Sequence, residues 1–266
     1  MKNEILSSIP VFIINLPQST DRKIFMKAQC ESVGISSIFI DAINGNDLSS
    51  LEIAQYCDQR TAKKLFGREL LLGEIGCALS HKKIYQKIVD ENIPYAVILE
   101  DDVIFEKEFS ETVNSILTSD RNWELILLGH HKDTYKGLSS PLSIWGKSCI
   151  NSKFSLNRLA DFGFGGYGYM ITLEGAKNLV IKLDKIYKPL DHYTPDSNIL
   201  NVYALFPTIV SVRNNFETLI GNHEERFFSR ERFLVKILEK THVINALRKA
   251  RGLFRVIKPI KKYKSK

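Results

Sequence analysis

Three consecutive carboxylates, Glu100, Asp101 and Asp102, follow directly on the apolar run 96–99. Such a run is typical of a strand that is covered on both faces. Adjacent carboxylates repel one another and resist removal from water, so they need a cation, strong hydrogen bonds or bulk solvent. A divalent metal is the usual cation for hard oxygen ligands. The cluster therefore predicts a metal site at the end of a buried strand; the alternative is a solvated turn in which Asp102 caps the next segment.

Two further polar residues stand at the ends of predicted strands. The run 11–16 predicts a first strand that carries Asn15 near its end, and 35–42 predicts a second strand with Asp41 near its end. A helix is predicted between them, from residue 19 or 20 to residue 33, where a glycine follows. Ligands of open α/β sheets bind at the carboxyl ends of the strands. We therefore expect Asn15, Asp41 and the acidic cluster to meet in a single crevice.

The rest of the chain alternates helical and strand patterns. Asp47 is suited to cap a short helix that ends near residue 57. Further helices are predicted over 74–90, 106–119 and 173–183, and further strands over 123–128 and 167–172. This alternation predicts an α/β fold with a mostly parallel central sheet covered by helices. The stretch 130–166 lacks either pattern and is expected to form a functional loop that covers the site.

Composition and cysteine usage point to an ordinary intracellular protein. The chain has 266 residues and 44% hydrophobic content, which suits a folded core. Its four cysteines show no paired spacing and are expected to be buried free thiols in a reducing compartment. The apolar stretch 9–16 is too short to span a bilayer, and no small-residue cleavage site follows it. These features predict a cytoplasmic location.

Charge divides the chain into a mildly acidic body and a basic tail. Residues 226–266 hold 14 Lys or Arg residues and two acidic residues, whereas residues 1–225 hold 23 and 28. Apolar residues of the tail recur at helical spacing between the basic ones, which predicts a basic amphipathic helix. Three interpretations stay open: an anchor on anionic lipid, a helix packed on the body, or a nucleic-acid contact, which the lack of interleaved aromatic residues disfavours. We expect one domain over 1–225 and a separate tail over 226–266.

Four segments in this order resemble glycosyltransferase family 25, the bacterial lipooligosaccharide sugar transferases that share a domain with collagen galactosyltransferases. They are 11–22, 41–45, 73–81 and 99–103, and the most specific is 73–81, which reads Gly-Glu-Ile-Gly-Cys-Ala-Leu-Ser-His. Weaker matches continue over 166–176 and 189–191. The basic tail lies outside the strong resemblance.

The resemblance implies a GT-A-type nucleotide-sugar-binding fold, a UDP-sugar donor such as UDP-galactose, and transfer with inversion to a β-linkage. It also implies a lipooligosaccharide or lipopolysaccharide acceptor. A membrane-borne acceptor agrees with the basic tail, so we expect a peripheral protein on the inner face of the cytoplasmic membrane that does not bind nucleic acid. The partners are then a nucleotide sugar, a lipid-linked oligosaccharide and an anionic membrane surface.

Roles for single residues follow from the same resemblance. Asp102 is the first choice as ligand of Mn²⁺ or Mg²⁺, with Asp101 or Glu100 helping directly or through water. Asp191 is the first candidate for the general base, a helix cap being its structural alternative, and Glu100 is the reserve. The residues expected at the donor are Asn15, Leu16, Ser19, Arg22, Asp41, Ala42, Gly45, Glu74, Gly76, Ser80, His81 and Asp101.

Purely structural roles are alternatives for several of these residues, and other functions are alternatives to glycosyl transfer. Arg22 also suits a solvated charge at a helix start, and His81 a packed group on a helix. A metal-dependent phosphohydrolase or nucleotidyltransferase also uses clustered carboxylates, although neither a P-loop nor an early Asp-x-Asp loop supports that function. A non-catalytic sugar- or membrane-binding protein is the third possibility.

Overall fold

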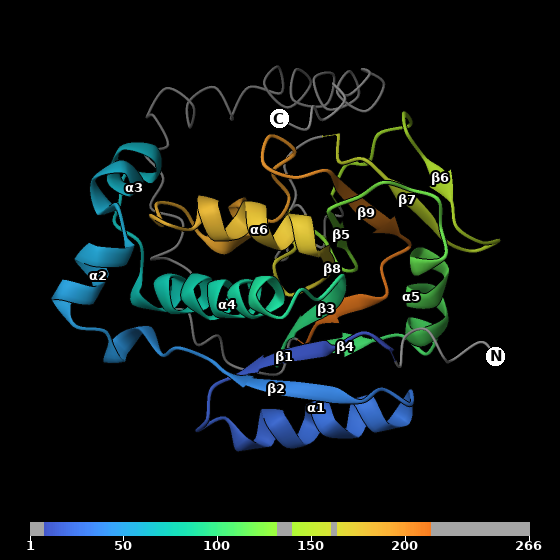
Figure 1. Cartoon of the computed structure of the whole chain (residues 1–266), viewed down its shortest axis with the longest axis horizontal. Helices are drawn as coiled ribbons and strands as arrows, with labels where there is room; N and C mark the ends of the chain where they lie inside the picture. Colours follow the sequence, from blue (N-terminus) through green and yellow to red (C-terminus); the bar gives the residue numbers. More distant parts are fainter. Residues whose placement is uncertain (1–7, 132–139, 161–163, 214–266) are drawn as a thin grey trace, which may run out of the picture.

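An eight-stranded sheet forms the centre of the computed structural model, which describes residues 8–131, 140–160 and 164–213 (Figure 1). A separate two-stranded sheet pairs β10 (Val210–Val212) with β4 (Val103–Phe105). In spatial order the central strands are β2 (Ser37–Asp41), β1 (Val11–Asn15), β3 (Tyr95–Glu100), β8 (Gly168–Thr172), β5 (Leu125–Leu127), β9 (Val202–Phe206), β7 (Ser155–Asn157) and β6 (Ser148–Cys149).

Six of the eight central strands point the same way. β1 is parallel to β2 and β3, and β5 is parallel to β9. β8 runs antiparallel to both β3 and β5, and β7 runs antiparallel to both β9 and β6. The predicted mostly parallel α/β sheet is thus confirmed. Because β8 is reversed, its first residues lie beside the carboxyl end of β3.

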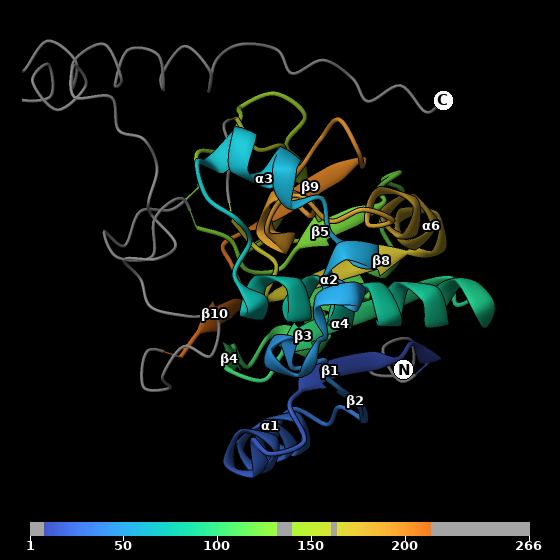
Figure 2. The ribbon, with the colours of Figure 1, turned by 90° about the vertical axis from the view of Figure 1, so that its left-hand side faces the viewer.

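Helices cover both faces of this sheet. α4 (Leu72–Asp90) and α6 (Leu173–Lys182) lie side by side on one face, and α1 (Thr20–Ser32) and α5 (Phe109–Leu117) lie on the other (Figures 1 and 2). Successive residues of a strand point to opposite faces. The buried side chains of β1 accordingly divide between the two layers: Phe12 and Ile14 pack with α4, and Val11 and Ile13 with α1. This is why the inner residues of β1 and β3 are apolar and why Asn15 and Glu100 come only at the carboxyl ends of the strands.

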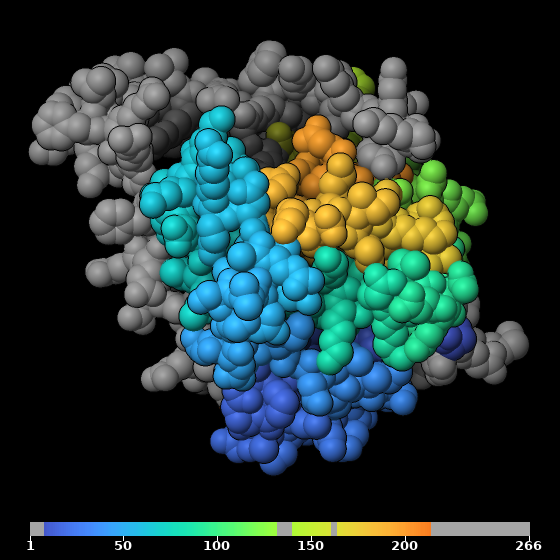
Figure 3. Space-filling view, turned by 60° about the vertical axis from the view of Figure 1, so that its left-hand side comes forward, coloured from blue at the N-terminus to red at the C-terminus, as the bar shows by residue number. Residues whose placement is uncertain are grey.

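The connection from β2 to α4 is built from short helices. They are η2 (Gly45–Asp47), α2 (Ser50–Tyr56) and α3 (Gln59–Phe66), and α2 and α3 form a raised surface beside α6 in Figure 3. The predicted cap at Asp47 is wrong, because Asp47 belongs to η2. Ser49 caps α2 instead: its side chain accepts from the Glu52 amide, and Glu52 Oε2 accepts from the Ser49 amide at 2.8 Å.

The stretch 130–166 is not a simple loop where the structure describes it. It contributes β6 and β7, which extend the sheet at the end opposite β2, and His131 forms an isolated bridge with Phe164. The sequence signal was weak because both strands are only two or three residues long. β9, in contrast, has the apolar run Val-Tyr-Ala-Leu-Phe, which is typical of a buried strand, although no strand is predicted there from the sequence.

Over the described ranges, none of the helices has both the length and the apolar character needed to cross a membrane. The predicted tail, residues 226–266, lies outside the described residues.

Candidate functional site

A pocket of about 110 Å³ opens at the carboxyl ends of β1 and β3. Its walls come from four places: the turn after β1 with α1, residues 42–46 between β2 and the end of η2, one face of α4, and the acidic residues at the end of β3. The expected residues that line it are Leu16, Arg22, Ala42, Gly45, Ser80, His81, Glu100, Asp101 and Asp102. The acidic cluster thus lies in a pocket at the strand ends as predicted, whereas Asn15 and Asp41, which were expected in the same crevice, are not among its lining residues. No described residue of the stretch 130–166 lines it, so the expected cover over the site is not seen there.

Asp101 is the anchor of a buried polar network at the end of β3. Its Oδ2 accepts from Asn15 Nδ2 at 2.7 Å, and its Oδ1 accepts from Arg22 Nη1 at 2.8 Å. Asn15 also donates to the Ser19 carbonyl at 3.1 Å, so the turn between β1 and α1 is tied to the acidic cluster. Both oxygens of Asp101 thus have partners within the protein. We assign Asp101 the task of holding Arg22 at the pocket.

Asp102 has a different environment. Its Oδ1 is buried without a hydrogen-bond partner, and its Oδ2 lies 3.6 Å from Arg22 Nη1. The pKa of Asp102 is raised to about 7, mainly by burial and also by the charges of Glu100 and Asp101, while Arg22 opposes the increase. A buried carboxylate oxygen without a donor is costly in the charged form. A cation beside it would remove that cost.

Glu100 faces α4 from the end of β3. Its Oε1 lies 3.6 Å from His81 Nε2 and 3.8 Å from Cys77 Sγ. His81 is fully buried, and its Nδ1 is 2.6 Å from the Tyr169 hydroxyl. Burial lowers the pKa of His81 to about 3, against the opposing charge of Asp191. The imidazole is therefore neutral at neutral pH. Cys77, a residue of the 73–81 motif for which the sequence predicts no role, also lines the pocket.

Glu74, Gly76 and Ser80, which were expected to bind the donor, make contacts within the protein. Both Glu74 oxygens accept from Arg68, at 2.7 and 2.8 Å, and Glu74 lies outside the pocket wall. Ser80 Oγ accepts from the Ile43 amide at 2.8 Å and donates to the Gly76 carbonyl at 2.6 Å. The start of α4 is thus shaped to hold the loop 42–46 against the pocket.

Two other expected donor residues stand apart from the pocket wall. The side chain of Asp41 is exposed, and its carbonyl accepts from Lys83 Nζ at 3.2 Å. Ser19 precedes α1 without a side-chain capping bond, and its carbonyl serves Asn15. The residue types of Asp41 and Ser19 do not reveal that they lie outside the pocket wall, because a position near a strand end does not decide where a side chain points.

Gly76 allows close contact between α4 and the loop before η2. A Cβ there would lie 2.5 Å from the Ile43 carbonyl oxygen and 2.7 Å from the Gly45 amide nitrogen. Gly76→Ala is therefore expected to destabilise the protein by about 1–3 kcal/mol through overpacking, even though alanine gains about 1 kcal/mol of helix propensity. Denaturant unfolding measures the change. Gly166→Ala is the matched control, since its Cβ would meet the Leu190 side chain at an ordinary 3.5 Å; equal stability of the two variants would contradict the packing role.

Asp191 lies near the pocket without lining it. It sits in η3 (Leu190–His192), which packs against Gly166 at the start of the β8 segment. Burial raises the pKa of Tyr167, and the charges of Glu100 and Asp191 raise it further. The Asp191 backbone thus lies beside Gly166, the neighbour of Tyr167 in the chain, whereas Glu100 lies 3.6 Å from His81.

The donor set suits a hard divalent ion at Asp102. The buried, unpartnered Oδ1 of Asp102 is the atom that such an ion would contact, and Glu100 is the neighbouring carboxylate on the same wall. Oxygen ligands of this type suit Mn²⁺ or Mg²⁺. Asp101 fits less well, because Asn15 and Arg22 already engage its oxygens.

Comparison with known proteins confirms the resemblance. A family model described as glycosyltransferase family 25 (LPS biosynthesis protein) matches residues 8–194, which include the whole pocket and η3. A glycosyltransferase 25 family member of Anopheles gambiae is 31% identical over 198 residues, covering 71% of this chain and 32% of that protein. Procollagen galactosyltransferase 1-A of Xenopus laevis is 28% identical over 194 residues, covering 70% of this chain and 30% of that protein. This chain thus spans about a third of the length of these relatives.

Among solved structures, a glycosyltransferase involved in the glycosylation of the major capsid of PBCV-1 aligns with a TM-score of 0.31 and 13% identity. The alignment covers 66% of this chain and 64% of that one. This similarity is too low to add to the sequence match.

Proposed function

This chain belongs to glycosyltransferase family 25, and from this premise we propose that it moves a hexose, galactose from UDP-galactose, onto a lipooligosaccharide or lipopolysaccharide acceptor with inversion to a β-linkage. One observation carries the proposal. The pocket brings a guanidinium, Arg22, and a buried carboxylate oxygen without a partner, Asp102 Oδ1, to the ends of β1 and β3. A diphosphate with its divalent ion needs both kinds of group.

Arg22 is the proposed contact to the donor diphosphate. The Asp101 carboxylate fixes its guanidinium, which leaves less rotamer entropy to lose when phosphate binds. Pockets for whole ligands measure roughly 300–1,000 Å³, so the described pocket of about 110 Å³ suits one part of the donor. We assign it to the diphosphate and the anomeric end of the sugar, because the charged groups gather there.

A divalent ion would supply Lewis-acid neutralisation of the leaving diphosphate, and Asp102, with Glu100, would hold it. This assignment is supported by the orphaned Asp102 oxygen. Asp101 contributes by orienting Arg22.

Asp191 is the proposed general base. The acceptor hydroxyl gives its proton to the Asp191 carboxylate while its oxygen bonds to the anomeric carbon; the bond from that carbon to the diphosphate breaks, and UDP leaves with the electron pair. The Asp191 backbone lies beside Gly166, and Asp191 is not part of the pocket wall that holds Arg22 and Asp102, which supports a role on the acceptor side. Glu100 is the alternative base, since it lies in the pocket itself.

A nucleotide-sugar panel tests the proposal directly. UDP-galactose with Mn²⁺ is expected to raise the melting temperature of the full chain by several degrees at saturating concentration, since each kcal/mol of binding linkage is worth about 2–4 °C at this chain length. Release of UDP should then increase when lipooligosaccharide is added. A panel in which no UDP-sugar raises the melting temperature or is turned over would refute the function.

We further propose that the basic tail, 226–266, holds the protein on anionic membrane, where the acceptor lies. Truncation after Glu225 is expected to weaken binding to phosphatidylglycerol vesicles and to leave turnover on a soluble acceptor intact. Each Lys or Arg near such a surface is worth about 1 kcal/mol, so the full-length variant Arg248→Gln, Lys249→Gln, Arg251→Gln should bind roughly 100-fold more weakly. Vesicle sedimentation measures both variants, with phosphatidylcholine vesicles as the control. Unchanged binding by the truncated chain would exclude the anchor.

A further inference from the structure

Three ligand-type side chains of different chemistry meet at the wall of the pocket. Cys77 and His81 are one turn apart on α4, which covers this face of the sheet (Figure 1), and Glu100 faces them from the end of β3. The Cys77 sulfur, a His81 ring nitrogen and a Glu100 carboxylate oxygen all lie within 4.8 Å of one another. In the described part of the chain this is the one group of three or more such residues close enough to share an ion.

His81 is already prepared as a metal ligand. Its ring is fully buried, its Nδ1 is hydrogen-bonded to the Tyr169 hydroxyl at 2.6 Å, and its Nε2 is buried without a partner. A histidine that binds a metal through one nitrogen almost always gives the other N–H to an outer partner, which fixes the ring. The Tyr169 hydroxyl oxygen can accept a hydrogen bond from that N–H, and the Tyr169 O–H can in turn donate to the Tyr85 hydroxyl oxygen. The nitrogen left over is the one that faces Glu100.

The separations of Glu100 from His81 and from Cys77 are close to those of a tetrahedral site. Bonds of about 2.0–2.3 Å in a tetrahedron place neighbouring ligand atoms roughly 3.3–3.6 Å apart. The Glu100 Oε1 atom lies 3.6 Å from His81 Nε2 and 3.8 Å from Cys77 Sγ. Both of these distances are close to the tetrahedral values, and the third separation, between the Cys77 sulfur and the His81 nitrogen, is at most 4.8 Å.

The chemistry of this set differs from that of Asp102. A thiolate, an imidazole and one carboxylate favour Zn²⁺, whereas Mn²⁺ and Mg²⁺ favour oxygen ligands. All three residues also line the pocket, so the fourth coordination position opens into it. Three protein ligands with one open position are typical of Zn²⁺ sites that contact a small molecule.

We propose that Cys77, His81 and Glu100 form an open, three-ligand Zn²⁺ site on the pocket wall. Binding releases the Cys77 thiol proton to solvent and draws Glu100 toward α4. An occupied site keeps the Glu100 carboxylate on the α4 side and away from an ion at Asp102, so Zn²⁺ is expected to inhibit the reaction that Mn²⁺ supports. Metal binding is measured without turnover, so the site stands or falls independently of the proposed function.

Co²⁺ substitution tests the site in the full-length chain, purified without a polyhistidine tag. The wild-type protein is expected to show a thiolate-to-Co²⁺ charge-transfer band and the intense visible bands of tetrahedral Co²⁺, and one equivalent of Zn²⁺ should abolish both. Cys77→Ser should lose the charge-transfer band and bind Zn²⁺ at least about 100-fold more weakly, since even outer-sphere changes cost 10–100-fold. Cys149→Ser is the matched control, because Cys149 is exposed and outside the cluster.

Two outcomes would overturn the proposal. One is a wild-type protein without the thiolate band; the other is a Cys77→Ser variant that keeps the band or the Zn²⁺ affinity. Circular dichroism guards against misfolding, and Cys77 is only partly buried, so its change to serine is mild. Tyr169→Phe provides a second variant outside the ligand set, with an expected loss in Zn²⁺ affinity of about tenfold.

Discussion

Asp102→Asn is expected to remove the stimulation of glycosyl transfer by Mn²⁺ and to lower kcat/KM at saturating metal by at least about 100-fold, because the ion supplies several kcal/mol of charge stabilisation. The physical reason lies at Asp102 Oδ1, which is buried without a donor and is the atom best placed to contact the ion. Asparagine keeps the size of the side chain and removes its charge. The measurement is a Mn²⁺ titration of UDP release from UDP-galactose, with a chelator series on the wild type.

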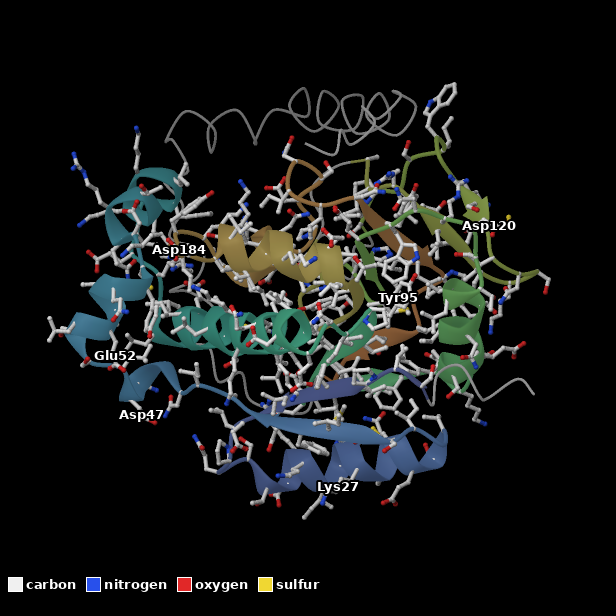
Figure 4. All side chains as sticks on the ribbon, in the orientation of Figure 1. Lys27, Asp47, Glu52, Tyr95, Asp120 and Asp184 are labelled. Atoms are coloured by element: carbon white, nitrogen blue, oxygen red, sulfur yellow. The ribbon has the colours of Figure 1, made fainter. Side chains whose placement is uncertain are left out.

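Asp120→Asn is the matched control for this change. Asp120 is exposed and lines a different pocket, which also contains Tyr95 at the start of β3; both residues are labelled in Figure 4. It should keep wild-type metal dependence. A normal Mn²⁺ response in Asp102→Asn, or full wild-type turnover in excess chelator, would reject the metal role.

Asp191→Asn is expected to lower kcat for transfer by about 10²–10⁴-fold, the usual contribution of a general base. Donor binding should be nearly unchanged, because Asp191 is not among the residues that line the pocket. The two measurements are kcat on lipooligosaccharide and the rise in melting temperature with UDP-galactose and Mn²⁺. Separation of these two effects distinguishes a base from a residue that binds the donor.

Glu100→Gln decides between the two candidate bases. If Asp191 is the base, Glu100→Gln should weaken the metal response together with turnover, since Glu100 lies in the pocket beside Asp102. Wild-type kcat in Asp191→Asn, with the large loss in Glu100→Gln at unchanged donor binding, would move the base to Glu100. Asp120→Asn again serves as the charge control.

Local patterns in the chain predict much of the fold. The apolar runs of β1 and β3 are buried on both faces, and α1, α4 and α6 begin and end close to their predicted limits. The apolar residues of these elements have a clear spacing, and this spacing is sufficient to distinguish helix from strand. β6, β7 and β10 are two or three residues long, and such short strands exist only because a neighbour pairs with them.

The direction of β8 is a tertiary property. Its sequence reads as a buried strand in either direction, but pairing against β3 and β5 reverses it. The reversal brings Tyr167 to Glu100, whose amide donates to the Tyr167 carbonyl at 2.9 Å. Nothing in a period-2 pattern encodes the direction of a strand.

By itself, the sequence determined the family, the α/β class and the place of the site at the ends of β1 and β3, because strand burial and the order of motifs are local properties. Only the tertiary structure decided how the acidic cluster divides its work. Asp101 is bonded to Asn15 and Arg22, Asp102 keeps an oxygen without a partner, and Glu100 turns toward His81 on α4. Three adjacent carboxylates are chemically alike along the chain, and they differ only through the neighbours that folding brings to each of them.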